Sequence, residues 1–460
     1  MDKKVIGKIE TLAQQTLDTH HLPGIALGVV QGGELAWFGG FGRGDINKDD
    51  APRLDSLARI ASVTKTLTTT AILQLRDLGK LHLDDPLTQH IPEFGAVQVR
   101  AGALADVTLR RLLTHHSGLS TEAPLPSWDA LNFPTREAIL GALDQTEIVI
   151  DQDSDWKYSN LAFGLLGEVI QRVSRQAYDD YIQDHILDPL GMDATVFDLD
   201  DTNQDHLLTG YNPTPYQDVP VKAPYAHLNG LSAAGQLHSS VADLAKWVSF
   251  QFCERGGDRG GAQVLSGRSL IEMHRPQYMA PDWSSGQCLG WRATRVGNHV
   301  YHNHGGGIHG FATQVWFHVP SQVGVIQFIN MWPPPGGQSL VQDVLEILLN
   351  GSANVSPVSD AKPLPVPQKY ADLLGLYGAE PGIWVSVVWR DGKLQLMVPK
   401  GQAYSLHASA VLLPALGEEI FRVVGGRGSG EQVVFERKDG CVTHYELGAF
   451  VFKKLVFATE

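Results

Sequence analysis

The chain has 460 residues, of which 43% are hydrophobic, and its 36 basic and 50 acidic side chains give a formal net charge of −14. This length predicts two or three domains with at least one large core. The acidic balance argues against nucleic acid or an anionic membrane surface as a partner. No stretch reaches the ~18 uninterrupted apolar residues that a membrane-spanning helix needs.

The N-terminus and the cysteines bear on the compartment. Residues 1–24 carry charges and lack the apolar core of a signal peptide. Cys253, Cys288 and Cys441 are widely spaced and form no Cys-x-x-Cys motif, which argues against a thiolate zinc site or a redox pair. We therefore expect a cytoplasmic protein, although a periplasmic or secreted chain trimmed of its leader would begin in the same way.

In chain order, the first predicted elements are strands, and helices follow. Residues 24–42 predict two strands around a turn at 31–34, and residues 62–79 predict a helix. From about 80 to 245 the sequence shows helical patches separated by proline and glycine, the clearest at 161–176. We interpret this region as a helical insertion.

Strands return in the second half of the first 350 residues. Residues 311–319 and 323–330 predict two strands, and 338–350 predict a closing helix. Because strands lie at both ends of residues 1–350, we expect one α/β domain in which the returning chain completes the sheet.

A linker and a second domain are predicted at the C-terminal end. Residues 351–368 hold four prolines and no apolar period, which is typical of a linker. Residues 369–460 are strand-like, with Asp-Gly pairs at 391–392 and 439–440 that favour hairpin turns. The pattern predicts a small all-β domain, either an antiparallel sheet or a barrel.

The first candidate catalytic pair is Ser62 and Lys65, at i and i+3 where the predicted helix begins. This spacing places both side chains on one side of the helix. The unpaired N–H groups of its first turn favour a developing negative charge, and an unprotonated amine can take the hydroxyl proton. The motif alone is weak, because Ser359 and Lys362 share its spacing in the linker. A capping serine followed by a surface lysine would also look the same.

Two further motifs carry groups suited to a cleft. Tyr158 and Asn160 precede an amphipathic helix, so a phenol and a carboxamide could be aimed from one loop, although packing and helix capping would explain them equally well. His304 is followed by three glycines up to Gly307, just before a predicted strand. Glycines there allow close approach to the backbone, whose free N–H groups can bind an oxyanion.

A metal site is not expected near that glycine run. His302, His304 and His309 lie close together in the sequence, but no HExxH motif or carboxylate at ligand spacing accompanies them. Nothing else in the chain implies a metal or an organic cofactor.

Taken in order, Ser-x-x-Lys, Tyr-x-Asn and the His-Gly-rich run resemble the motifs of the penicillin-recognising serine hydrolases. This superfamily contains class C β-lactamases, serine D-Ala-D-Ala peptidases and related esterases. The segments 112–119 and 229–247 resemble further stretches of the family, and the likeness extends over about 15 to 350. The strands after the linker resemble, more loosely, the lipocalin-like appendage of some members.

The resemblance implies a fold and a set of roles. The fold is an antiparallel sheet flanked by helices beside an all-helical subdomain. Ser62 would be the acylated nucleophile, Lys65 its activator and Tyr158 the general base. Asn160 would orient the substrate, and the backbone N–H groups of Ser62 and Gly307 would form the oxyanion hole. His304 stands where many β-lactamases carry lysine, which weakens recognition of a β-lactam carboxylate.

We therefore predict a serine hydrolase that cleaves an ester, amide or peptide bond through an acyl-enzyme. An esterase or peptidase is favoured over an efficient β-lactamase. A slowly deacylating penicillin-binding or sensor protein and an acyltransferase stay open, because sequence does not display the second nucleophile. Self-association through the C-terminal strands is a further expectation.

Overall fold

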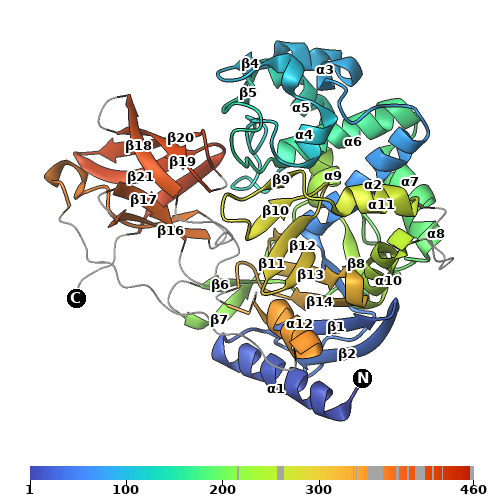
Figure 1. The fold of residues 1–460 in the computed structure, drawn as a ribbon. Helices are drawn as coiled ribbons and strands as arrows, with labels where there is room; N and C mark the ends of the chain where they lie inside the picture. The colour runs from blue at the N-terminus through green and yellow to red at the C-terminus, as the bar shows by residue number, and fades with distance from the viewer. Residues whose placement is uncertain are drawn as a thin grey trace.

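The computed structural model describes residues 1–214, 217–255, 264–334, 336–337, 339–350, 366–379, 383–390, 393–398, 410–416, 419–426 and 428–455. It consists of a main part, residues 1–350, and a barrel that stands at its side (Figure 1). The expected linker lies outside the described residues over 351–365, as does the predicted Asp391–Gly392 turn.

The main part is built on an eight-stranded sheet in which every pairing is antiparallel. In spatial order the strands are β2 (Glu34–Gly42), β1 (Gly24–Gln31), β14 (Val323–Ile329), β13 (Phe311–His318), β12 (His299–Ile308), β11 (Arg292–Val296), β10 (Ser285–Gln287) and β9 (Tyr278–Met279). β1 pairs with β14 from Ile25 opposite Ile329 to Gln31 opposite Val323. This pairing confirms that the returning chain completes the sheet.

Helices cover the sheet, and most of them come from the middle of the sequence (Figure 1). They are α1 (Lys3–Thr19), α2 (Thr64–Asp77), α3 (Leu87–His90), α4 (Leu109–Leu113), α5 (Arg136–Gly141), α6 (Asn160–Ser174), α7 (Tyr178–Ile182), α8 (Asp188–Leu190), α9 (Ser232–Gly235), α10 (Val241–Gln251), α11 (Gly267–His274) and α12 (Leu340–Asn350). α12 packs on β13, β14 and α1, while α10 packs on β1, β2 and β14.

The expected helical insertion at 80–245 contains helices α3 to α9 and the start of α10, together with short strands and loops. Three two-stranded sheets join β3 (Leu57–Arg59) to β8 (His238–Ser240), β4 (Gln98–Val99) to β5 (Glu147–Ile148), and β6 (Tyr211–Thr214) to β7 (Gln217–Lys222). Segments of two to six residues are too short to show a two-residue period, which explains why the sequence did not reveal them.

Helix α2 is buried on nearly all sides although it is rich in threonine. Most of its hydroxyls have hydrogen-bond partners, whereas Thr64 Oγ1 has none among the described residues. Thr66 Oγ1 donates to Val63 O at 2.7 Å, and Thr68 Oγ1 donates to Ala233 O at 2.7 Å. Buried polar groups need such partners. Most of the threonine hydroxyls find them on backbone carbonyl oxygens, so the helix can lie in the core although it is polar.

The C-terminal strands close into an eight-stranded barrel, which confirms the expected small all-β domain. They are β15 (Gly375–Ala379), β16 (Ile383–Arg390), β17 (Lys393–Met397), β18 (Ala410–Leu416), β19 (Ile420–Val424), β20 (Gln432–Lys438), β21 (Cys441–Leu447) and β22 (Phe450–Lys454). Asp439 and Gly440, with φ of 52° and 80°, form the turn between β20 and β21. Positive φ at both central residues is the geometry that favours Asp-Gly in hairpins.

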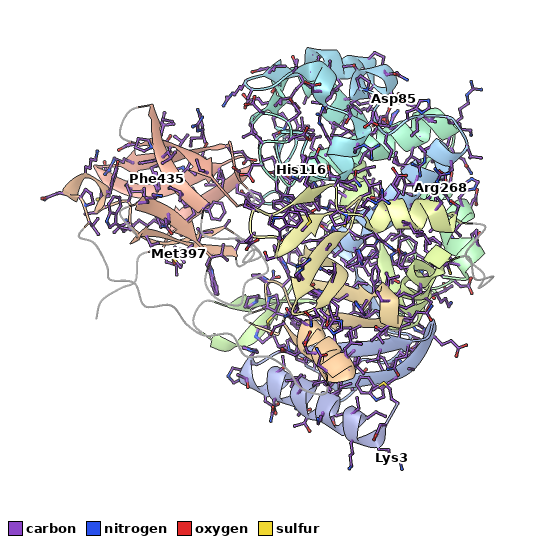
Figure 2. The ribbon with its side chains drawn as sticks, viewed as in Figure 1. Lys3, Asp85, His116, Arg268, Met397 and Phe435 are labelled. Carbon is purple, nitrogen blue, oxygen red and sulfur yellow. The ribbon has the colours of Figure 1, made fainter. Side chains whose placement is uncertain are left out.

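Aromatic rings fill much of the barrel interior. Phe435 is buried among the strands (Figure 2), 5.7 Å from the ring centre of Phe421 and 6.0 Å from that of Tyr377. Within the described residues, no helix is long and apolar enough to cross a membrane.

Candidate active site

Ser62 lies in a short 3₁₀ turn, η1 (Ala61–Val63), directly before α2. Its neighbour Ala61 has a φ of 46°, in the left-handed region that side chains disfavour. Such a backbone costs about 1–3 kcal/mol and persists only where surrounding contacts hold it. The serine is therefore presented from a strained turn at the start of a buried helix.

Lys65 is fully buried and reaches three oxygen atoms. Its Nζ donates to Ser62 Oγ at 3.1 Å, to Asn160 Oδ1 at 2.9 Å and to the backbone oxygen of Ala234 at 2.7 Å. These three acceptors match the three donors of an ammonium group. The structure thus joins the first two predicted motifs through one lysine.

Asn160 is the first residue of α6, where Ser159 caps the helix by accepting from Ala162 N at 2.9 Å. The Asn160 amide donates from Nδ2 to Glu122 Oε1 at 2.6 Å. Because one end of the amide donates to a carboxylate, its oxygen is directed at Lys65. The sequence predictions missed Glu122, which lies 38 residues away in a segment with no motif.

Tyr158 stands beside Lys65, with the lysine Nζ 5.0 Å from the centre of its ring. The imidazole of His115 packs on Tyr158 with the rings tilted by 33° and 4.2 Å between ring centres, and its Nδ1 accepts from Ser159 N at 3.2 Å. His115 thus supports the loop that carries Tyr158. It was not among the predicted site residues, although it lies in the family-like stretch 112–119.

A small pocket of about 30 Å³ opens beside the serine. It brings together Ser62, Asn160 and Gly307, and its remaining walls are mainly apolar, including Trp128 and Leu231. Of the other predicted site residues in the described chain, Lys65, Tyr158 and His304 lie outside its lining.

The glycine run lies within β12 and not before a strand as predicted. The strand continues through the run because Gly305, Gly306 and Gly307 pair in register with Gln314, Thr313 and Ala312 of β13. A Cβ on Gly306 would lie 2.1 Å from Ile60 O, in the backbone that leads to Ser62. A Cβ on Gly307 would lie 2.1 Å from the Trp332 Nε1 atom. The glycines therefore allow β12 to approach the serine turn.

His304 is partly buried on β12, and its Nδ1 lies 2.8 Å from Gly305 O. Burial, reinforced by the positive charge of Lys65, lowers the pKa of His304 to about 3. The imidazole is therefore neutral at physiological pH. His302 instead contacts His274 O at 2.9 Å, and His309 packs edge-on against Trp128. The part of the chain that the structure describes holds no cluster of His, Cys, Asp or Glu suited to a metal ion.

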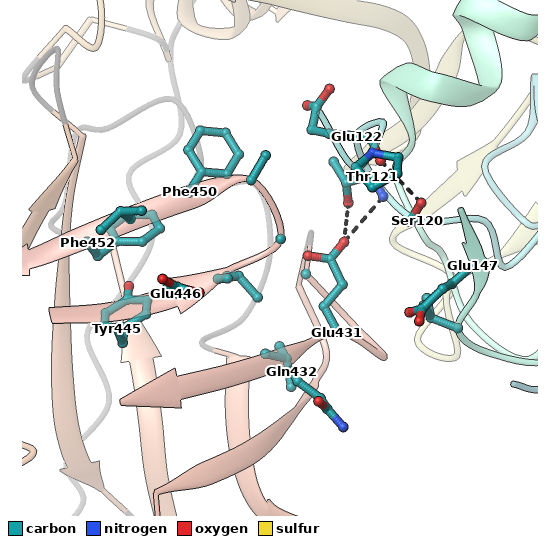
Figure 3. A pocket seen from close by; sticks show the side chains of 18 of the residues that line it. Ser120, Thr121, Glu122, Glu147, Glu431, Gln432, Tyr445, Glu446, Phe450 and Phe452 are labelled. Atoms are coloured by element: carbon teal, nitrogen blue, oxygen red, sulfur yellow. Dashed lines mark hydrogen bonds between the residues drawn. The ribbon is translucent and has the colours of Figure 1, made fainter. Parts of the chain in front are cut away.

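The barrel reaches the candidate site through Glu431, directly before β20 (Figure 3). The buried Lys157 Nζ donates to Glu431 Oε1 at 2.6 Å and to Thr121 Oγ1 at 2.6 Å. Thr121 Oγ1 also donates to Glu431 Oε1, at 2.8 Å. Burial alone would raise the pKa of Glu431, but the charge of Lys157 and these hydrogen bonds hold it below its ordinary value. No sequence motif pointed to Glu431.

A second contact joins the barrel to the wall of the small pocket. The Phe450 ring at the start of β22 stacks with Trp128, with 6.3 Å between ring centres. The backbone N–H of Val451 donates to Asp129 Oδ2 at 3.3 Å. The segment around Trp128 is thus held between the site and the barrel.

Comparisons with known proteins place this fold. The model of a family described as Beta-lactamase matches residues 9–348. The chain belongs to the beta-lactamase family. This membership confirms the resemblance seen in the motifs and supports a serine hydrolase.

Curated relatives match part of the chain. Protein flp of Staphylococcus aureus (strain MW2) is 32% identical over 249 residues, which are 53% of this chain and 48% of that protein. Beta-lactamase-like protein 2 of Dictyostelium discoideum is 27% identical over 282 residues, which are 60% of this chain and 49% of that protein. The chain spans about half the length of the curated relatives it matches.

Solved structures share the fold at low identity. The octameric penicillin-binding protein homologue from Pyrococcus abyssi has a TM-score of 0.65 and 23% identity, and the match covers 99% of this chain and 100% of that one. A class C beta lactamase from Rhodobacter sphaeroides has a TM-score of 0.59 and 19% identity, covering 70% of this chain and 93% of that one. These matches confirm the β-lactamase/transpeptidase-like fold of the main part.

Proposed function

We propose that this beta-lactamase family member hydrolyses uncharged esters or amides through an acyl-enzyme at Ser62. The observation that carries the proposal is the buried Lys65 ammonium group, 3.1 Å from Ser62 Oγ and 2.9 Å from Asn160 Oδ1. A buried cation that touches a serine hydroxyl in a pocket is suited to nucleophile activation.

Acylation follows from the positions of these groups. The charge of Lys65 favours the phenolate form of Tyr158, which accepts the proton of Ser62 as Oγ attacks the substrate carbonyl carbon. The backbone N–H groups of Ser62 and Gly307 would stabilise the resulting oxyanion. When the intermediate collapses, the bond to the leaving group breaks and the leaving group takes the proton from Tyr158.

Deacylation repeats these steps with water as the nucleophile. Tyr158 takes a proton from water, the hydroxide oxygen attacks the acyl carbon, and Ser62 Oγ leaves with the proton returned by Tyr158. Asn160 would hold the acyl group, because its amide is fixed between Lys65 and Glu122.

The neutral state of His304 supports an uncharged substrate. A lysine at this position would attract a carboxylate, whereas a neutral imidazole offers only ordinary hydrogen bonds. We therefore expect esters or amides to be cleaved in preference to β-lactams, with nitrocefin slow.

A substrate panel tests the proposal. Short-chain p-nitrophenyl esters, D-amino acid amides and nitrocefin are compared for the wild type, Ser62→Ala and the control Ser266→Ala. Ser266 caps α11 and lies outside the site, so its loss costs only about 1 kcal/mol of stability and leaves activity intact. Turnover of the Ser62→Ala variant at the wild-type rate would overturn the assignment of the nucleophile.

Mass spectrometry separates this proposal from its alternatives. After addition of a fluorescent penicillin or an activated ester, a hydrolase shows an adduct of Ser62 that disappears with time. A lasting adduct would indicate a sensor or binding protein. A product formed with an added alcohol or amine would indicate an acyltransferase.

We further propose that residues 369–460 form a separate domain after a linker at 351–368, and that copies of this chain self-associate. The neighbour from Pyrococcus abyssi, which matches the barrel as well, is described as octameric. Light scattering of the full chain tests self-association, and a monomer at micromolar concentration would contradict it.

A further inference from the structure

A cavity of about 750 Å³ lies where one end of the barrel meets the main part (Figure 3). The main part contributes residues 120–126 and β5 to its wall. The barrel contributes residues from seven strands, β16 to β22, among them Ile383, Val385, Leu396, Val423, Tyr445 and Phe452. Its size falls within the ~300–1,000 Å³ typical of small-molecule sites.

The barrel side of the wall is mainly apolar, although Glu431, Gln432 and Glu446 also line it. Leu396 and Val385 are each 7% exposed, and Phe452 stacks on Tyr445 with 4.7 Å between ring centres. The aromatic cluster around Phe435 fills the rest of the interior. The end of the barrel that is distant from the main part is thus filled by side chains, and the cavity lies at the end that faces the main part.

One polar group inside this wall lacks a partner. The Tyr445 side chain is fully buried, and its Oη has no hydrogen-bond partner among the described residues. Burial raises the pKa of Tyr445, so the group stays a neutral hydroxyl. A buried hydroxyl without a partner costs about 1–3 kcal/mol, but its lack of exposed surface means that a molecule in the cavity does not reach it.

The charges around the cavity select against anions. Four carboxylates line it, those of Glu122, Glu147, Glu431 and Glu446, against the single guanidinium group of Arg100. That guanidinium group is 2.6 Å from Glu147 and is therefore already paired. A negatively charged ligand would lose its hydration and meet groups of the same sign.

We propose that this cavity binds an apolar molecule that has no negative charge. The site goes beyond the proposed hydrolase activity, because it shares no lining residue with the pocket that Ser62 lines. Binding there can be measured without any turnover.

Two probes that differ in one charged group test the proposal on the full chain. N-phenyl-1-naphthylamine is neutral, and 1-anilinonaphthalene-8-sulfonate has the same skeleton with an added sulfonate. We expect the neutral probe to gain fluorescence on binding. It should bind at least ~10-fold more tightly than the sulfonate probe, because the two differ by one charged group. Equal affinities for the two probes would overturn the proposal. The same holds if the neutral probe does not bind at ~100 μM, a concentration that detects even weak sites.

Matched variants locate the bound probe. Leu396→Trp fills the cavity and should weaken binding at least ~10-fold, whereas Leu413→Trp, on the outer face and 40% exposed, should leave it within ~2-fold. Val385→Phe is a milder filling variant for the case that Leu396→Trp does not fold. Wild-type affinity in folded Val385→Phe would place the probe elsewhere and overturn the proposal.

Discussion

Glu431 of the barrel and Lys157 of the main part form a buried ion pair of 2.6 Å, one residue before Tyr158. The Lys157 side chain is fully buried and that of Glu431 is 12% exposed. The neighbouring Gly430, with a φ of 85°, comes so close to Ile150 that a Cβ there would lie 2.3 Å from its side chain. The barrel therefore anchors the loop that carries the proposed general base.

Glu431→Gln should lower kcat for a short ester by about 10–100-fold, because small displacements of a catalytic group cost this much. KM should change little, since Glu431 lies outside the small pocket. Steady-state kinetics with p-nitrophenyl acetate measure both constants.

Glu446→Gln makes the same chemical change on an exposed barrel carboxylate and should leave kcat within about 2-fold. Replacing both partners, as Lys157→Met with Glu431→Leu, should recover activity relative to Glu431→Gln, because no buried charge is left unpaired. If Glu431→Gln keeps the wild-type kcat, the ion pair only attaches the barrel.

Lys65→Ala and Tyr158→Phe should each reduce kcat/KM by about 10³-fold or more, and the double variant by little more than either. The reason is that Lys65 and Tyr158 would act on the same proton, and the cation lies 5.0 Å from the ring centre. Purified variants with wild-type circular dichroism are compared on one ester. Losses that multiply would show that the two side chains act independently.

Gly306→Ala should reduce activity at least ~100-fold, because its new Cβ would press on Ile60 O and displace the Ser62 turn. Gly305→Ala is the control. Its Cβ would meet the end of the Gln314 side chain at 2.9 Å, which can move aside. Labelling of Ser62 by a fluorophosphonate reports on the turn directly, and equal labelling of both variants would contradict this account.

His304→Lys should shift the ratio of kcat/KM toward carboxylate-bearing substrates by about 1–2 kcal/mol, the scale of one charge-assisted hydrogen bond. His299→Lys, at the start of the same strand, is the matched control and should leave the ratio unchanged. Rapid nitrocefin hydrolysis by the wild type would count against this role, as would an equal loss on every substrate in His304→Lys.

Acid should destabilise the main part through its buried histidines, which include His238 and His309 as well as His302 and His304. Burial, aided by the charge of Arg59, lowers the pKa of His238 from 6.5 to about 3 and that of His309 from 6.5 to about 4. As pH falls below 6.5, the unfolded chain takes up protons that the folded chain does not. The free energy of unfolding should therefore drop by up to about 1.4 kcal/mol per pH unit for each histidine.

Urea denaturation between pH 7 and pH 4.5 checks this dependence, because over this range the imidazoles of His238 and His309 gain protons mainly in the unfolded chain. His309→Gln should reduce the slope of the free energy of unfolding against pH. The control His82→Gln, at an exposed position, should not. An unchanged slope in His309→Gln would show that its imidazole is protonated in the folded chain.

Much of the fold could be predicted because its elements carry regular patterns. The apolar run that became β14 and the Asp439–Gly440 turn are local signals, set by burial and by backbone preference. The short strands β4, β5 and β8 could not be predicted, because partners distant in the chain, and not their own residues, define them.

By itself the sequence determined the order of the motifs and the residue types available for chemistry, since Ser62, Lys65 and Tyr158 are recognised by spacing. Tertiary structure alone decided which distant groups complete the site. Glu122 directs Asn160, His115 supports Tyr158, and Glu431 arrives from another part of the chain. These contacts depend on packing between segments 38 to 274 residues apart, and such packing leaves no periodic trace in the sequence.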